Sequence, residues 1–273
     1  MAVKTGSAPT YSNTVAVSAP VTAAGKAFSL ALTAWLQDTR LMSEAAYRLS
    51  RQYKKEGTIT FATASWPKPE KPGLPLKDFK MGPTALQERT SQLLKNLWST
   101  RFVFLETLWE EYLEDLVKEL RLRDAAIFEP FVEREFMVDI VRDVLTERLN
   151  SVDEIKQEVA SRFAAGLTRQ SWEQQWKQLS RLGVGLSAKD NLLPWWPKLD
   201  IYFEMRNCII HRQARVSPAL FAKDEFYSVK GLDRIEVWPP QLDFFRHQFI
   251  ACLLYMEACI DARFKAAAVA LSI

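Results

Sequence analysis

The residues with the clearest chemical potential lie in one short stretch, Arg206-Asn207-Cys208-Ile209-Ile210-His211, and Arg212 follows it directly. An arginine can hold a phosphate through two parallel hydrogen bonds, and a histidine can move a proton near neutral pH. Together these two groups could cleave an RNA backbone without a metal ion. The chain contains only two histidines, so the place of one of them in this stretch carries weight.

The stretch ends an apolar, aromatic-rich segment over residues 192–210. Its RNCIIH spacing resembles the RN-x3-H motif, also written R-x4-H, of the HEPN superfamily of all-helical proteins, many of which are ribonucleases. Residues 102–120 resemble the long first helix of that family, and residues 213–265 resemble its ending. The resemblance covers roughly residues 86–265. One HEPN branch of toxins carries a tyrosine where this chain has Gln213, so the chain is more similar to the stand-alone HEPN proteins found beside stress and anti-phage defence genes.

This resemblance implies a metal-independent endoribonuclease that acts as a toxin or an anti-phage defence effector. The RNA 2′-hydroxyl would attack the adjacent phosphorus and leave a 2′,3′-cyclic phosphate and a 5′-hydroxyl. We expect His211 to move the proton and Arg206 to hold the phosphate and stabilise its developing charge. We expect Asn207 to orient His211 or a phosphate oxygen. Glu111, on the preceding long helix, is the expected partner that fixes Arg206, and Arg212 is expected to support the site.

The spacing of Arg206 and His211 also bears on assembly. Residues five apart on an ideal helix differ by about 140° in direction, so both side chains face one way only if the helix ends between them. Two copies of the motif facing each other provide another solution, which HEPN ribonucleases are thought to use. The resemblance therefore implies a homodimer with the active cleft between protomers. A toxin of this kind would also need an antitoxin or another regulatory protein.

Each residue of the motif also has a structural explanation. Cations such as His211 and Arg212 stabilise the C-terminal end of a helix through its dipole. Arg206 could pair with Glu111 or Glu114 for stability alone. The alternative function is thus a non-catalytic HEPN-like bundle that binds RNA, a nucleotide or a protein partner. A third alternative is an inhibitor or scaffold within a defence complex.

Further candidates for contact with RNA lie outside the motif. Trp195 and Trp196 adjoin the motif helix and could stack an unpaired base, although most tryptophans of the chain are expected to be core. Four lysines in a proline-rich segment could follow a phosphate backbone, although a solvated loop is the commoner explanation. These lysines are Lys68, Lys71, Lys77 and Lys80.

The pattern along the chain predicts an all-α fold, namely a HEPN-type up-and-down bundle of four to five helices. Residues 1–85 form an N-terminal extension with a helix at about 22–56 and a proline-rich loop at 58–84, and residues 86–273 form the HEPN-like domain. Within that domain we expect helices at about 86–123 and 130–150, a motif helix from about residue 196, and a last helix after Pro240. Capping boxes at Ser151/Glu154 and Ser171/Gln174 should start two further helices. Alternating residues around Gly231 predict a small β-hairpin over 226–238.

Composition limits the remaining classes of function. The net charge of +3 requires any nucleic-acid surface to be a local patch. The three cysteines, Cys208, Cys252 and Cys259, show no zinc-ligand spacing, and the second histidine, His247, lies on an apolar helix. No phosphate-binding glycine loop is present, and no apolar run spans a bilayer. We therefore expect no metal, no cofactor and no membrane contact, and a cytoplasmic location.

Overall fold

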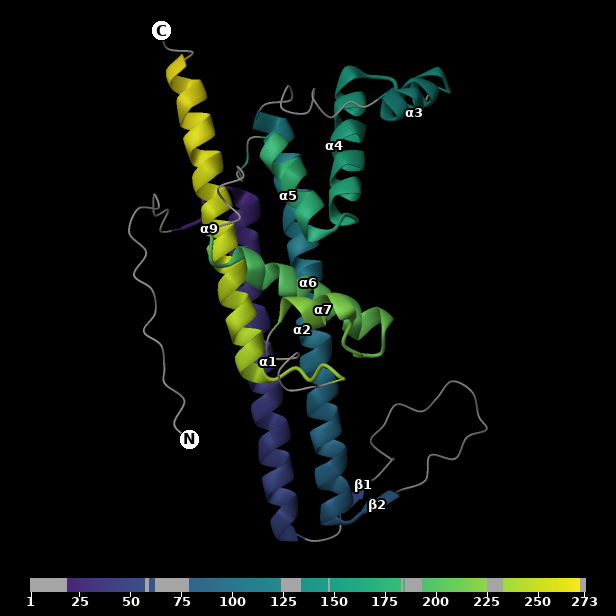
Figure 1. Cartoon of the computed structure of the whole chain (residues 1–273), viewed down its shortest axis with the longest axis vertical. Helices are drawn as coiled ribbons and strands as arrows, with labels where there is room; N and C mark the ends of the chain where they lie inside the picture. The colour runs from purple at the N-terminus through teal and green to yellow at the C-terminus, as the bar shows by residue number, and fades with distance from the viewer. Residues whose placement is uncertain are drawn as a thin grey trace. The chain divides into compact units, whose positions relative to one another are not determined.

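The computed structural model describes residues 19–56, 59–61, 79–123, 134–146, 148–182, 184, 193–224 and 233–270. Helices dominate this part of the chain, which confirms the predicted all-α class. Figure 1 shows the helices in chain order: α1 (Ala23–Glu56), α2 (Pro83–Arg123), α3 (Arg134–Leu145), α4 (Val152–Thr168), α5 (Trp172–Arg181), α6 (Trp196–His211), α7 (Pro218–Lys223) and α9 (Pro239–Ala270).

The described β-structure consists of two short antiparallel strands at the ends of the proline-rich segment. Strand β1 (Ile59–Phe61) pairs with β2 (Phe79–Met81), with Thr60 opposite Lys80. The hairpin predicted over residues 226–238 is not seen. Residues 225–232 lie outside the described residues, and the described remainder contributes one isolated bridge, between Arg215 and Arg234.

Two compact units make up the chain, and each combines segments distant in sequence. The first contains Met1–Ser29, Glu110–Asp200 and Gln248–Ile273, and the second contains Leu30–Trp109 and Ile201–His247. The boundary predicted after residue 85 falls within α2 and inside the second unit, so these units do not follow it.

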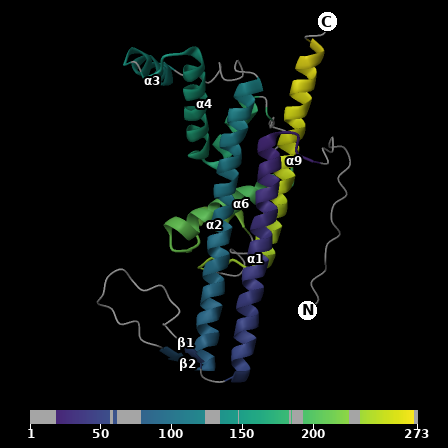
Figure 2. The ribbon, with the colours of Figure 1, turned by 180° about the vertical axis from the view of Figure 1, so that it is seen from behind.

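In the second unit, α1 and α2 lie side by side (Figures 1 and 2). The indole of Trp35 donates a hydrogen bond to the carbonyl of Arg101 at 3.1 Å, and the indole of Trp98 donates to the Ser43 hydroxyl at 3.0 Å. Tryptophan is well suited to this position because its ring is apolar while its N–H finds a partner. These contacts hold the two helices in register within the unit.

The motif helix α6 is attached to α2 by an aromatic contact. The ring centroids of Phe102 and Tyr202 lie 4.6 Å apart, and the Tyr202 hydroxyl donates to the carbonyl of Phe102 at 2.6 Å. Phe245 packs edge-on against Phe102. All three side chains are buried. Because residues four apart share a helix face, this contact turns Arg206 of α6 toward the same side of the helix as Tyr202.

In the first unit, carboxylates from distant helices bind the free amides that begin α1. Glu257 accepts hydrogen bonds from the amides of Val21 and Thr22 at 2.8 and 2.7 Å, and it is fully buried. A Cβ on Gly25 would lie 2.6 Å from the carboxyl carbon of Glu257, so a side chain cannot fit there without a shift. A carboxylate at this position satisfies exposed N–H groups and complements the helix dipole.

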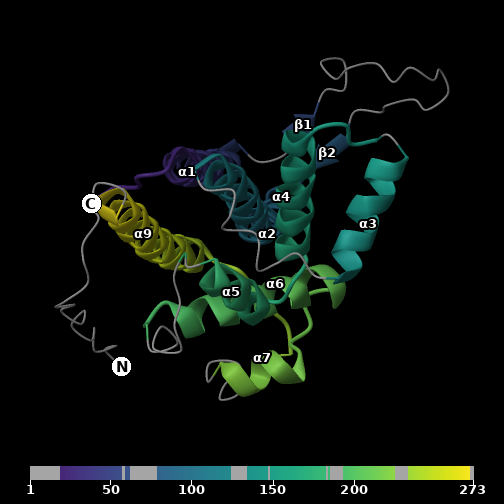
Figure 3. The same cartoon turned by 90° about the horizontal axis from the view of Figure 1, so that it is seen from above.

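The helices α3, α4 and α5 follow one another in the first unit (Figure 3). Arg162 of α4 ties α3 to α4 through ion pairs with Asp139, at 3.7 Å, and with Asp143. The predicted capping box at the start of α4 is confirmed, since Ser151 and Glu154 bond each other's backbone amides.

Other predicted boundaries need correction. Ser171 caps α5 by position, but its side chain makes no capping hydrogen bond, so the expected box with Gln174 does not form. The helix expected over 130–150 is described only as Arg134–Leu145, and Pro130 lies outside the described residues. The short helix α7 was not predicted, although Ser217 caps it by accepting from the amide of Leu220 at 3.0 Å.

Candidate functional site

The last two turns of α6 present the motif. The Arg206 guanidinium forms an ion pair through Nε with Oε2 of Glu106 on α2. Its Nη1 donates a hydrogen bond to Oδ1 of Asn207 at 3.2 Å. The Arg206 side chain remains 24% exposed, whereas Glu106 is buried. The guanidinium is therefore held at one edge and keeps part of its hydrogen-bonding surface open to solvent.

The carboxylate that fixes Arg206 is Glu106 and not Glu111, which corrects the sequence-based expectation. Both lie on α2, and Glu111 is exposed. Five residues turn a helix by about 140°, so the two glutamates cannot face α6 together. Glu106 lies one turn after Phe102, just as Arg206 lies one turn after Tyr202. The aromatic contact and the ion pair are thus successive links between α2 and α6 that sequence spacing alone does not reveal.

His211 is the final residue of α6, and its side chain is exposed. Within the described ranges, no group forms a hydrogen bond or an ion pair with its imidazole. Arg212 is also exposed, and its amide donates to the carbonyl of Cys208 at 3.1 Å. Among the described residues, nothing therefore restrains the His211 ring, and its side chain is exposed.

The second histidine has a different environment. Nδ1 of His247 lies 2.7 Å from the carbonyl oxygen of Asp243, and Nε2 lies 3.1 Å from Nη2 of Arg246. These contacts assign the Nδ1-protonated tautomer, with Nε2 accepting from the guanidinium. His247 therefore has both nitrogens engaged, whereas the imidazole of His211 has no such contact with any described residue.

The chain reverses direction directly after the motif. Gln213 and Ala214 adopt left-handed backbone conformations, with φ of 54° and 62°. The amide of Ala214 donates to the carbonyl of Cys208 at 2.9 Å, which closes the end of α6. Left-handed geometry in residues with a side chain costs energy and is concentrated at functional sites and tight turns.

Beyond this reversal, the chain pairs with a segment that precedes α9. Val216 donates to the carbonyl of Asp233 at 2.9 Å, and Ile235 donates to the carbonyl of Ala214 at 2.7 Å. These bonds enclose the bridge between Arg215 and Arg234. Backbone hydrogen bonds on both sides of the Arg215–Arg234 pair therefore fix the chain reversal after His211.

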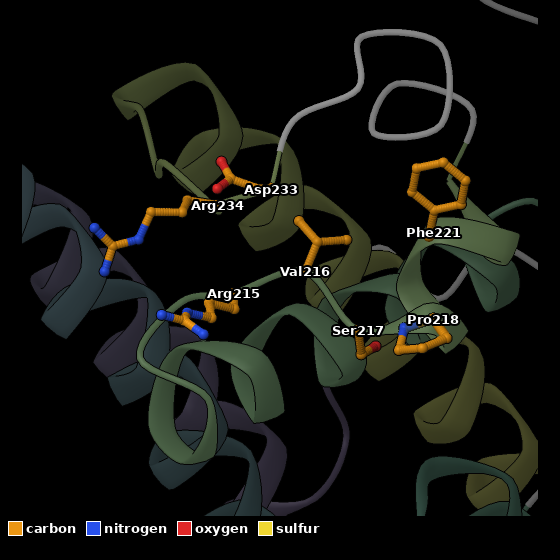
Figure 4. A pocket seen from close by; sticks show the side chains of 7 residues that line it. All are labelled: Arg215, Val216, Ser217, Pro218, Phe221, Asp233 and Arg234. Carbon is orange, nitrogen blue, oxygen red and sulfur yellow. The ribbon is translucent and has the colours of Figure 1, made fainter.

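An open pocket of about 870 Å³ lies at this pairing. Figure 4 shows the side chains that line it, with the two arginine side chains directed to the same side and the ring of Phe221 at the opposite end. The lining residues are Arg215, Val216, Ser217, Pro218, Phe221, Asp233 and Arg234. Sequence reasoning missed this pocket because its lining residues come from two irregular segments, 215–221 and 233–234, that the bridge brings together.

The other predicted RNA-contacting residues are two tryptophans and four lysines. Trp195 is buried, and its ring lies 5.5 Å from that of Trp176 and 5.9 Å from that of Tyr255. Trp196 is half-buried against Trp172. The expectation that Trp195 stacks a base is therefore wrong, because the first unit uses this ring as core. Lys68, Lys71 and Lys77 lie outside the described residues, and Lys80 is placed only by its backbone in β2.

The described residues show neither a metal site nor a membrane-spanning helix. Within it, no group of three or more histidine, cysteine or acidic residues is arranged to hold a metal ion. Cys208 and Cys252 are buried, and burial raises the pKa of the Cys252 thiol well above its usual range. None of the described helices has the length and apolar character needed to cross a bilayer.

Comparison of the chain with protein-family models, with curated proteins and with solved structures finds no match. The likeness to HEPN proteins therefore rests on the motif Arg206-Asn207-x3-His211 and its flanking helical segments.

Proposed function

We propose that the chain is a metal-independent endoribonuclease of the HEPN type, with Arg206, Asn207 and His211 as its reacting groups. The observation that carries this proposal is the contrast between two side chains in the last two turns of α6. Arg206 is oriented by the buried Glu106, and His211 is exposed with an unengaged imidazole in the described chain. Cleavage by an internal hydroxyl needs a cation that stabilises the phosphate and a group that transfers a proton, and these two residue types can supply both.

In the proposed reaction, the 2′-oxygen of the RNA forms a bond to the adjacent phosphorus as the bond from phosphorus to the 5′-oxygen breaks. His211 takes the proton from the 2′-hydroxyl or gives a proton to the departing 5′-oxygen. Arg206 stabilises the charge that develops on the phosphate oxygens through its exposed N–H groups. Asn207, which accepts from Arg206, leaves its amide N–H groups for a phosphate oxygen.

The proposal includes a homodimer with the cleft between protomers. One imidazole cannot act as base and acid in the same step, whereas two facing copies of His211 supply one of each. The exposure of His211 at the end of α6 is compatible with such pairing. A role as toxin or anti-phage effector, held in check by an antitoxin or another regulatory protein, belongs to the same proposal.

The direct test is cleavage of single-stranded RNA by the purified full chain in excess EDTA, with analysis of the product ends. The proposal predicts undiminished cleavage and products that end in a 2′,3′-cyclic phosphate and a 5′-hydroxyl. Products with a 5′-phosphate, or loss of activity on chelation that added metal restores, would overturn it.

A second candidate is a non-catalytic bundle that binds RNA, a nucleotide or a protein partner. One observation favours it: no described side chain orients the ring of His211, whereas general bases in active sites are usually held by a partner. Growth on induced expression separates the two candidates. A nuclease toxin loses its effect with His211→Ala, and a binding protein keeps it.

A further inference from the structure

The bridge after the motif places two like charges opposite each other. The hydrogen bonds of Val216 and Ile235 on either side of it make Arg215 and Arg234 a non-hydrogen-bonded antiparallel pair. Side chains of such a pair lie on one face of the ladder and come closer together than in hydrogen-bonded pairs. Like charges directly opposite each other destabilise a ladder. An anion between or beside the two guanidinium groups would offset this repulsion.

No described carboxylate serves as that anion. Among the described residues, neither Arg215 nor Arg234 forms an ion pair, and Asp233 lines the same pocket without contacting either guanidinium at ion-pair distance. Arg234 instead donates from Nη2 to the carbonyl of Gln213 at 3.3 Å. Both arginine side chains are exposed, so their remaining N–H groups are available to a ligand.

The opposite end of the pocket is apolar. Figure 4 shows Phe221 and Pro218 across the pocket from the two arginines, with Val216 between them. The ring of Phe221 is 47% exposed, so one of its faces can receive a flat partner. A nucleotide has the matching polarity, because it carries an anionic phosphate at one end and a flat base at the other. The pocket volume also falls in the range of about 300–1,000 Å³ that is usual for small-ligand sites.

We infer that this pocket binds one nucleotide of single-stranded RNA, with its phosphate on Arg215 and Arg234 and its base stacked on Phe221. The inference rests on the proposed function and gives the site its substrate class, because base stacking requires an unpaired strand.

The pocket lies close enough to the motif to hold the same strand. The carbonyl of Gln213, to which Arg234 donates, belongs to a residue only two positions after His211. Consecutive Cα atoms are about 3.8 Å apart, so the Cα atoms of His211 and Gln213 lie within about 7.6 Å of each other. The pocket and His211 therefore lie on either side of one chain reversal.

Binding is measured by fluorescence anisotropy with a labelled single-stranded RNA of mixed sequence, over a range of salt concentrations. The parent protein carries His211→Ala, so that cleavage does not interfere. The pocket variant adds Arg215→Gln and Arg234→Gln. The control adds Arg48→Gln and Arg51→Gln instead. These two exposed arginines of α1 do not line the pocket, and their substitution removes the same amount of charge. Melting curves confirm that all variants are folded.

The pocket variant is expected to lose roughly tenfold or more in affinity, and the slope of log affinity against log salt is expected to fall by about 0.7, the value for one phosphate contact to a single strand. The control is expected to change little. Phe221→Ala is expected to lose about fivefold or more, and Phe221→Trp to bind as well as the parent. Equal losses in the pocket and control variants, or RNA binding that Phe221→Ala leaves unchanged, would overturn the inference.

Cleavage is scored separately, with His211 intact. Normal RNA binding through the pocket without cleavage would refute the nuclease and leave the pocket standing. Cleavage by a chain whose pocket variants bind like the control would refute the pocket and leave the nuclease standing.

Discussion

The Nε atom of Arg206 contacts Oε2 of Glu106, and this ion pair couples the motif helix to the long helix α2 one turn beyond the contact of Tyr202 with Phe102. Burial of the glutamate makes the pair an anchor, because a buried carboxylate needs a partner for its charge. The direction of the guanidinium is thus set by α2, while its outer N–H groups stay open for a phosphate.

Replacing Glu106 with glutamine should lower RNA cleavage while leaving RNA binding nearly intact. The neutral amide no longer fixes the guanidinium, so we expect the rate constant of cleavage to fall at least about tenfold, a barrier change of about 1.4 kcal/mol. The free energy of unfolding should drop by about 1–3 kcal/mol. Single-turnover kinetics separate the cleavage step from binding.

Glu111→Gln is the matched control for this change, since it alters the same residue type on the same helix at an exposed position. We expect it to cleave like the wild type. An equal loss in both variants would show that the charge of α2, and not the contact with Arg206, matters for activity.

The reversal after α6 contains backbone strain that glycine would relieve. Ala214 has a φ of 62°, where a Cβ atom is unfavourable. Ala214→Gly should raise the free energy of unfolding by about 0.5–1 kcal/mol. Ala262→Gly, in the exposed interior of α9, should instead lower it by about 1 kcal/mol. Urea unfolding of both variants checks the prediction, and a fall in both would contradict it.

Sequence patterns predicted the local features of this chain well. The spacing of apolar residues predicted α1 and α2, and apolar segments that follow proline and turn residues predicted α6 and α9. The capping box of Ser151 with Glu154 follows from a four-residue signature. Such features depend on residues within a turn or two of each other. For the same reason, Arg206 and His211 could be recognised as candidates before any fold was known.

Features that depend on contacts between distant segments were not predictable in this way. The choice of Glu106 over Glu111 depends on which side of α2 faces α6. Trp195 looked accessible beside the motif helix, yet it packs against Trp176 of α5. The pairing of Arg215 with Arg234 depends on a bridge between two irregular segments. In each case the contact depends on how another segment of the chain is oriented or placed, which local sequence patterns do not specify.

The free energy of unfolding at alkaline pH should depend on two buried side chains of the first unit, the Tyr112 hydroxyl and the Cys252 thiol. Burial, and next the charge of Glu257, raise the pKa of Tyr112 well above its ordinary value of 10.0. Burial likewise raises the pKa of Cys252 above 9.0. A raised pKa in the folded state means that the folded chain holds the proton more tightly. The contribution of Tyr112 and Cys252 to the free energy of unfolding is therefore complete below the pKa of the unfolded state. It is lost as the pH rises from that value through the raised pKa of the folded state.

Urea unfolding between about pH 8 and pH 11 should show a falling free energy of unfolding for the wild type. Tyr112→Phe should be less stable at pH 8, because it loses the hydrogen bond to Glu257, but its stability should fall less steeply above pH 10. Parallel curves for the two proteins would contradict the assignment of this pH dependence to Tyr112.

The two histidines allow the most direct test of the central claim, since they differ in environment within one chain. The measurement is RNA cleavage in EDTA by the wild type, His211→Ala and His247→Ala. The account predicts that His211→Ala loses at least about a hundredfold in rate, as expected for removal of a general acid or base, while His247→Ala, whose ring is already engaged by Asp243 and Arg246, cleaves normally. Equal rates for the wild type and His211→Ala would contradict the assignment of this chain as a ribonuclease that acts through His211.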